Sequence, residues 1–197
     1  MKKKIFILTF LIFLFTQKGF GYSSDPKQFI TEIVDEAKAI LIATNTKEFR
    51  TKKLSEIALK SVDIKGVAYY SLGSYRKKLN DEQMKEYLSL FEKYFLKSFT
   101  SRLADYSDPK IDVLSAEVVN EKYTIVKSML LKTDKKPEVK IDWRVYTKNP
   151  EKPLIRDLII EGLSLARTQK EEFASILSTN NNDINALFIK LEEFINK

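Results

Sequence analysis

Four stretches in the second half of the chain alternate apolar and polar residues. They cover residues 111–119, 123–132, 139–146 and 154–160. A period of two is typical of a β-strand that buries one face and exposes the other to water. The connections at 120–121, 133–137 and 148–153 are short and contain asparagine or proline, so they predict an antiparallel meander.

Apolar residues elsewhere recur every three or four positions, which is typical of helices with one buried face. The predicted helices cover residues 26–41, 46–62, 63–73, 80–106, 163–177 and 183–195. Asn80 and Gln83 have the spacing of a capping box at the start of the longest helix, and Asp108-Pro109 is expected to stop it. At roughly 1.5 Å per residue this helix is about 40 Å long.

The order of these elements predicts an α+β fold, because most helices precede the strands. We expect a curved, antiparallel four-stranded meander sheet covered by several helices on one face, with NTF2-like character. Gly162 is expected to let the chain leave the sheet and begin the next helix. The length suits a single domain over residues 22–197.

Residues 1–21 have the pattern of a cleaved signal peptide. Lys2, Lys3 and Lys4 form a basic start, an apolar stretch follows at 5–15, and small residues stand before the expected mature start at Tyr22. The apolar run is too short to span a bilayer. Removal of this segment leaves 30 basic and 27 acidic residues, a net charge of +3, so composition does not support nucleic-acid binding.

The sequence contains neither histidine nor cysteine. Their absence excludes the Ser-His-Asp triad, the HExxH zinc site, disulfides, thiolate metal sites and cysteine nucleophiles. The phosphate-binding motifs GxGxxG and GxxxxGK[ST] are also missing. We therefore expect a protein without catalytic residues of these kinds, without a metal and without a cofactor.

Asp157 and Glu161 are the strongest candidates for a catalytic carboxylate pair, because both lie near the end of a predicted strand. With a tyrosine, such a pair suits a small α+β hydrolase or isomerase. In the structural alternative, Asp157 pairs with a nearby Arg or Lys, and Glu161 bonds to backbone at the corner between sheet and helix. We favour the structural interpretation and keep the enzyme as an alternative.

A stripe of large side chains on the longest predicted helix is the main candidate for a ligand site. It contains Tyr87, Phe91, Phe95 and Phe99. A helical face of this kind more often packs into a core than lines a pocket. Further large side chains stand at Tyr69, Tyr70, Tyr75 and Trp143. Together they are numerous enough to line a cavity or to fill it, and a filled core would indicate a non-catalytic interaction module.

Two sets of residues carry a resemblance to a known family. The first is Asp157, Leu158, Ile159, Ile160, Glu161, Gly162, Leu163, Ser164 and Leu165, followed by Gln169 and Phe173. The second is Asp63, Ala68, Leu72, Gly73, Tyr75 and Arg76, followed by the helix at 91–103. The chain resembles the MlaC family of periplasmic phospholipid carriers, also called toluene-tolerance auxiliary proteins. One departure is Pro153, where that family usually has a tryptophan.

The resemblance implies a periplasmic phospholipid-binding carrier that shuttles lipids between the inner and outer membranes and maintains outer-membrane lipid asymmetry. It implies an inner-membrane lipid ABC transporter complex and an outer-membrane lipoprotein complex as partners, with phospholipid as cargo and no cofactor. An apolar cavity between sheet and helices would hold the acyl chains. We expect it to be lined by Tyr75, Phe91, Phe95, Phe99, Met129, Leu131, Ile141, Trp143, Val145, Leu158, Ile160 and Leu163.

The mouth of such a cavity must leave the phosphate in water. Arg76 or Arg167 is a candidate for contact with the phosphate, although each also suits a solvated surface charge. Adaptable side chains such as Met129 predict weak selectivity for the headgroup.

Overall fold

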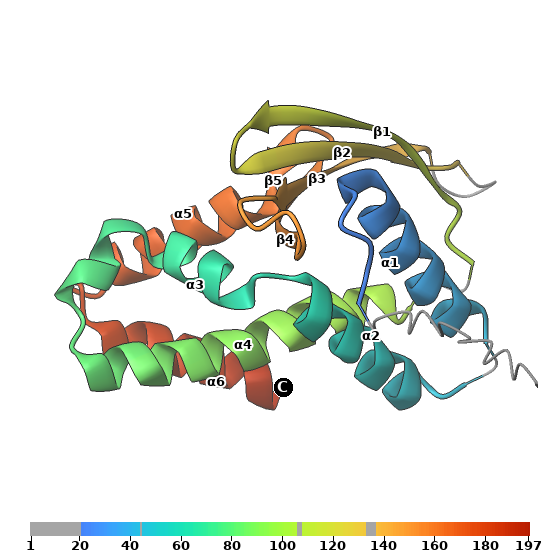
Figure 1. Cartoon of the computed structure of the whole chain (residues 1–197). Helices are drawn as coiled ribbons and strands as arrows, with labels where there is room; N and C mark the ends of the chain where they lie inside the picture. Colours follow the sequence, from blue (N-terminus) through green and yellow to red (C-terminus); the bar gives the residue numbers. More distant parts are fainter. Residues whose placement is uncertain (1–20, 44, 106–107, 133–136) are drawn as a thin grey trace, which may run out of the picture.

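The structure is a computed structural model that describes residues 21–43, 45–105, 108–132 and 137–197. Its helices are α1 (Pro26–Ile42), α2 (Lys47–Ser61), α3 (Ile64–Leu72), the 3-10 helix η1 (Gly73–Lys78), α4 (Asp81–Leu103), α5 (Leu165–Thr179) and α6 (Ile184–Asn196). Its strands are β1 (Ile111–Asn120), β2 (Tyr123–Leu130), β3 (Val139–Tyr146), β4 (Leu154–Ile160) and β5 (Leu163–Ser164). The helices lie on one side of the sheet (Figure 1). The predicted signal peptide lies outside the described residues, apart from Gly21.

The strands form one antiparallel sheet in the order β1-β2-β3-β4-β5. This confirms the predicted α+β fold and its meander of four long strands. The fifth strand follows a turn in which Glu161 and Gly162 have positive φ angles of 49° and 82°, as in tight type I′ hairpins. The chain therefore turns back along β4 before it leaves the sheet. Ser164 then caps α5, so this helix begins at Leu165 rather than at the predicted Leu163.

Side-chain caps fix the starts of the helices. Asp25 precedes Pro26, the first residue of α1. Its carboxylate accepts a hydrogen bond from the Gln28 N–H at 2.8 Å. The predicted capping box of Asn80 and Gln83 is present at the start of α4. Within the described ranges, no helix combines the length and the apolar character that a bilayer span needs.

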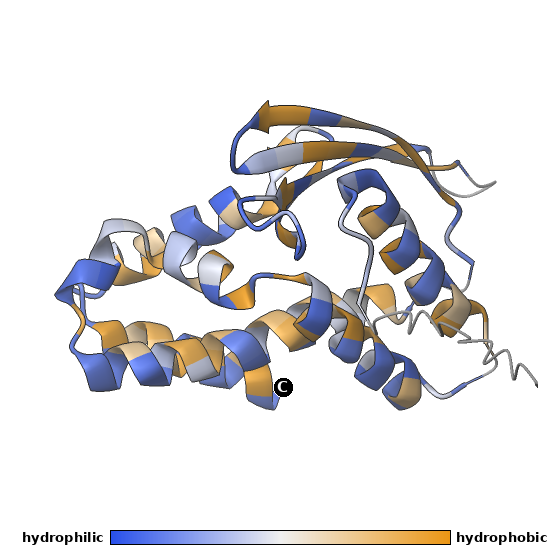
Figure 2. Cartoon of the chain, viewed as in Figure 1, coloured by the Kyte–Doolittle hydropathy of each residue, from blue (hydrophilic) through white to orange (hydrophobic). Residues whose placement is uncertain are grey.

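The buried apolar side chains form two clusters. We call the first the helical core: it lies among α3, α4, α5 and α6 and includes Tyr87, Phe173 and Leu187, each at most 2% exposed. The second, the sheet core, lies between α1, α2 and the sheet and includes Phe29 and Val145. Figure 2 shows hydrophobic residues along α4 and α6, which run side by side, and along the strands above α1. The chain therefore has two separate cores, one among helices and one between helices and the sheet.

The junction between α2 and α3 attaches to β4. Val62 forms a parallel bridge with Ile155, and the Asp63 N–H donates to the Ile155 carbonyl at 2.9 Å. The register of β3 and β4 shifts at Arg144, so Arg156 has no pairing partner on β3. Arg156 instead bonds to the Asp63 carboxylate, with its Nη2 2.6 Å from Oδ2. This ion pair holds the first turn of α3 against the sheet.

Candidate functional site

A pocket of about 270 Å³ lies where the two cores meet, and we call it the apolar pocket. One wall is the middle of α4, and the facing wall comes from β3 and β4. The first turns of α3 and α5 complete it through Val67, Leu165 and Ala166. Most lining side chains are aliphatic or aromatic, so the pocket suits a hydrocarbon ligand.

The α4 wall is a stack of phenylalanine rings. Phe91, Phe95 and Phe99 are spaced four residues apart and therefore share one helical face. The ring centroids of Phe91 and Phe95 lie 6.2 Å apart, and those of Phe95 and Phe99 lie 5.7 Å apart with nearly parallel planes. Phe91 is completely buried, whereas Phe95 and Phe99 are only half-buried. The stack thus runs from the helical core into an accessible wall.

The sheet wall is centred on Trp143. Its indole Nε1 donates to the Ser128 hydroxyl at 2.9 Å, and that hydroxyl donates to the Ile141 carbonyl at 2.9 Å. Because the one polar group of the indole is satisfied within the sheet, the ring is available as apolar surface. Ile155 and Leu158 extend this surface along β4.

A polar link joins the two helices at the pocket. The Tyr94 hydroxyl donates to Gln169 Oε1 at 2.6 Å, and Gln169 Nε2 donates to Glu172 at 2.9 Å. All three residues line the pocket. This link connects α4 to α5 with hydrogen bonds that water can replace, so it resists separation of the helices less than a packed apolar contact does.

Five of the residues predicted to line a cavity do lie on the apolar pocket: Phe91, Phe95, Phe99, Trp143 and Leu158. Two others belong to the sheet core, where Val145 is completely buried and Ile141 packs against the cluster. Tyr75, on η1, packs against the helical core instead. Periodicity places these residues on an inward face, but it does not show which of them pack against other side chains and which line a pocket.

The remaining four predicted lining residues lie away from the pocket. Met129 pairs with Asp112 and Lys140, one residue out of phase with Ser128, so it is on the outer face of the sheet. Leu131 lies just beyond the end of β2. Ile160 and Leu163 flank the turn between β4 and β5, and Leu163 is 59% exposed. The sequence predicts a direct exit from β4 into a helix here. The chain instead forms a tight hairpin, which explains the exposure of Leu163.

Several lining residues were missed by sequence reasoning. They are Val62, Val67, Tyr94, Ser98, Ile155, Leu165, Ala166, Thr168, Gln169 and Glu172, with Arg156 and Asp157. Tyr94 belongs to the same apolar stripe on α4, and Gln169 was among the residues that carried the family resemblance. Val62 gave no usable signal, because its position depends on the bridge to Ile155. That bridge joins segments more than ninety residues apart in the chain.

The candidate catalytic carboxylates have structural partners. Asp157 is buried and accepts from the Ser164 hydroxyl at 2.6 Å and from the Ala166 N–H at 2.9 Å, with Arg144 Nη1 at 3.5 Å. Glu161 is exposed and accepts from the backbone N–H of Lys140. These contacts confirm the structural interpretation of the pair. Asp157 holds the first turn of α5, and Glu161 secures the hairpin.

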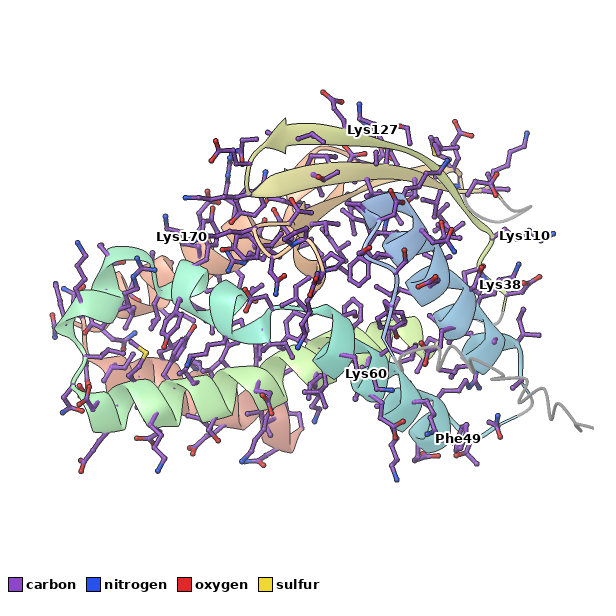
Figure 3. The ribbon with its side chains drawn as sticks, in the orientation of Figure 1. Lys38, Phe49, Lys60, Lys110, Lys127 and Lys170 are labelled. Atoms are coloured by element: carbon purple, nitrogen blue, oxygen red, sulfur yellow. The ribbon has the colours of Figure 1, made fainter. Side chains whose placement is uncertain are left out.

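A second cavity, the charged groove, lies on the other side of β4 and measures about 640 Å³. It extends over the outer face of the sheet, from which Lys127 projects in Figure 3. Its charged lining consists of Arg76, Arg144, Arg156, Asp142 and Asp157. Arg76 therefore lies at a cavity, as expected for a phosphate contact, whereas Arg167 is an exposed residue outside the groove lining. The apolar pocket and the charged groove share Arg156, Asp157 and Ala166.

Arg156 is the most strongly held cation between the two cavities. Its Nε and Nη2 contact the Asp63 carboxylate at 2.7 and 2.6 Å, and its Nη1 donates to the Tyr123 hydroxyl at 3.0 Å. The guanidinium also lies 3.5 Å from the centroid of the Tyr146 ring. Burial acts to lower its pKa, but the hydrogen bonds to Tyr123 and Asp63 outweigh burial and raise the pKa above its usual value. Each nitrogen of the Arg156 guanidinium thus has a hydrogen-bond partner, and its charge is held in a fixed position.

Comparisons with known proteins give a family and a similar fold. The sequence profile of the MlaC protein family matches residues 28–193. Among solved structures, the fold is similar to that of a phospholipid-binding protein from Ralstonia solanacearum, solved in complex with a phospholipid. The two share a TM-score of 0.72 and 17% sequence identity over 84% of this chain and 94% of that one. The search of curated proteins gives no match.

Proposed function

Because the chain belongs to the MlaC family, we propose that it is a phospholipid carrier that holds acyl chains in the apolar pocket. The family consists of periplasmic lipid carriers that catalyse no reaction. The similar Ralstonia solanacearum protein was solved with a phospholipid bound. The observation that carries the proposal is the position of the apolar pocket. It lies between the helical core and the sheet core, and the side chains of neither core fill it.

The energetics of lipid transfer require such a site. A diacyl phospholipid exposes some thirty methylenes in water, at about 0.8 kcal/mol each, so free diffusion is opposed by roughly 25 kcal/mol. A carrier must cover nearly all of this surface with apolar side chains. Phe95, Phe99, Trp143 and Leu158 provide an accessible apolar surface of this kind. No reactive group takes part, since transfer consists of moving the tails from one apolar environment to another.

The pocket must open to accept a whole lipid. Its volume of about 270 Å³ is just below the roughly 300–1,000 Å³ typical of sites for drug-sized ligands, and a diacyl lipid is larger than those ligands. We infer that the helical core and the sheet core separate around α4, which contributes Phe91 to the first and packs Leu103 against the second.

The cellular part of the proposal follows from the family. We propose that a signal peptide is cleaved before Tyr22, that residues 22–197 act as one domain in the periplasm, and that the protein shuttles phospholipids between the inner and outer membranes. Its partners would be an inner-membrane lipid ABC transporter complex and an outer-membrane lipoprotein complex, and its role would be to maintain outer-membrane lipid asymmetry. The Tyr22 hydroxyl bonds to Glu36 at 2.5 Å, so the proposed mature N-terminus is fixed to α1.

The test is the lipid content of the protein purified from its native compartment without refolding. Extraction with organic solvent and mass spectrometry should recover phospholipid at a near-equimolar ratio. Ser98→Trp places an indole in the pocket and should reduce this ratio strongly. Ser89→Trp, at an exposed position on the same helix, is the matched control and should retain the lipid. A wild-type protein that carries no lipid and extracts none from vesicles would contradict the proposal.

A further inference from the structure

We propose that the charged groove binds the zwitterionic headgroup of a phospholipid that carries a primary amine, such as phosphoethanolamine. Arg76 and Arg144 would contact the phosphate, and Asp142 would accept from the ammonium. This inference rests on the proposed function, because it assigns the headgroup of the lipid whose tails occupy the apolar pocket. The sequence predicts weak selectivity for the headgroup, whereas this inference gives a preference for a headgroup with a primary amine.

The two cavities are placed so that one lipid can reach both. They lie on opposite faces of β4, and Arg156, Asp157 and Ala166 line both of them. At the edge of β4, Gly66 lines the groove and its neighbour Val67 lines the pocket. The first turns of α3 and α5 thus lie on either side of the three residues that line both cavities, which we call the partition. A lipid with its tails in the pocket would pass its phosphate around this edge into the groove.

The groove contains two arginines with donors to spare. Arg76 is exposed on η1 and forms no ion pair or side-chain hydrogen bond with any part of the chain that the structure describes. Arg144 is 40% exposed at its side chain and has a single long contact, 3.5 Å from Asp157. A phosphate between them would receive charge-assisted hydrogen bonds of the kind that arginine forms best. Arg156 is less suited to this role, because each of its nitrogens already bonds to Asp63 or Tyr123.

Asp142 supplies the acceptor for the amine. Its Oδ1 is buried and has no hydrogen-bond partner among the described residues, although its Oδ2 lies 3.4 Å from Lys140 Nζ. A buried carboxylate oxygen without a donor is unfavourable, so a ligand that brings a donor gains free energy there. Asp157 is less suited to this part, since each of its oxygens already accepts a hydrogen bond, one from Ser164 and the other from Ala166. The groove therefore offers two cations and one available anion.

This arrangement discriminates between headgroups. An ammonium gives Asp142 a hydrogen bond between two opposite charges, whereas a glycerol hydroxyl gives one in which only the carboxylate is charged, and that bond is weaker. With the bond from the ammonium taken as about 1.4 kcal/mol better, the preference for the amine is about tenfold. A free phosphate shares the contacts with Arg76 and Arg144 but brings no cation to Asp142.

The experiment measures extraction of lipid by the purified chain from vesicles of phosphatidylethanolamine or phosphatidylglycerol in neutral phosphatidylcholine, with identical acyl chains. Asp142→Asn keeps the shape of the side chain and removes its charge, and Asp112→Asn on the exposed strand β1 is its matched control. Arg76→Gln removes a proposed phosphate contact, with Lys77→Gln as the control from the same short helix. A parallel titration with inorganic phosphate alone tests whether the groove is simply an anion site.

We expect the wild type and both controls to take up the ethanolamine lipid about tenfold better than the glycerol lipid. Asp142→Asn should remove this preference, and Arg76→Gln should reduce uptake of both lipids. If Asp142→Asn keeps the preference, or if phosphate binds at Arg76 while uptake is independent of headgroup, the headgroup assignment is wrong and the carrier function stands. If the wild type extracts neither lipid, the carrier function itself fails.

Discussion

The side chains at the centres of the helical core and the sheet core are fully buried, whereas the region between the two cores contains a pocket. Leu187 and Val145, at the centres of the two cores, have no exposed surface. Phe95 and Phe99, on the helix that passes between the cores, remain half-buried beside the apolar pocket. One aromatic stripe on α4 thus serves two purposes. Tyr87 lies within the helical core, Phe91 belongs both to that core and to the wall of the pocket, and Phe95 and Phe99 line the pocket one and two turns later. The function of a side chain here depends on what stands opposite it.

The largest effect is expected for removal of a ring from a completed core. Phe173 is 2% exposed and contacts the rings of Tyr87, Phe91 and Tyr94. Phe173→Ala should lower the free energy of unfolding by about 3–5 kcal/mol in denaturant titrations. Phe49→Ala is the control, because Phe49 is 43% exposed on α2 (Figure 3) and should change stability by less than about 0.5 kcal/mol. Equal losses in the two variants would mean that the helical core is not a packed unit.

A smaller effect is expected at the junction that ties α3 to the sheet. A Cβ atom at Gly66 would collide with the Asp63 carboxylate, which accepts from the Gly66 N–H and holds Arg156. Gly66→Ala should therefore destabilise the protein by about 1–3 kcal/mol, although alanine is the better helix former. The same change should loosen the partition between the two cavities, and faster lipid exchange would report this. A stabilised variant would show that Asp63 is free to move away.

Tyr87 makes the stability of the helical core dependent on pH. Its hydroxyl donates to the Ala68 carbonyl at 3.0 Å, and burial raises its pKa above the usual 10.0. An unfolded chain ionises this tyrosine near pH 10 and the folded chain does not, so the free energy of unfolding should fall as pH rises above about 10. Tyr87→Phe should cost about 1 kcal/mol at pH 7 and reduce this alkaline loss. Part of the alkaline loss of stability should remain in this variant, because burial also raises the pKa of Tyr22.

The smallest effect on stability is expected at the pocket wall. Phe99 is half-buried and lines the apolar pocket. Phe99→Ala should lower the free energy of unfolding by less than about 1 kcal/mol, because little of its contact area lies within a core. Retention of lipid during purification should nevertheless fall. A loss of stability as large as that of Phe173→Ala would show that Phe99 is a core residue and that the comparison between the regions does not hold.

Much of the fold could be predicted because its signals are local. Alternation marks β3, the Asn80–Gln83 spacing marks the start of α4, and both are confirmed. The hairpin at Glu161 and Gly162 was missed, because glutamate at a positive φ angle gives no sequence signal of its own. Pro153, where the MlaC family usually has a tryptophan, is buried just before the start of β4. The strand forms in spite of this difference.

The site could be predicted only in part, since its residues come from contacts between distant segments. Phe91, Phe95 and Phe99 follow from one helical stripe, and Trp143 from one strand face. Val62 and Ile155 meet through a bridge that no local pattern indicates. The charged groove was also beyond local reasoning, because Arg76 and Asp142 belong to elements that only the folded chain brings together.

The most direct test of the apolar pocket is to find where a bound acyl chain lies. A phospholipid with a photoactivatable diazirine in one tail would be loaded onto the purified protein, irradiated and mapped by peptide mass spectrometry. We predict cross-links within residues 91–99 of α4 and residues 155–158 of β4. Cross-links confined to exposed apolar residues of β1, such as Leu114 and Val118, would place the lipid on the surface and contradict the account.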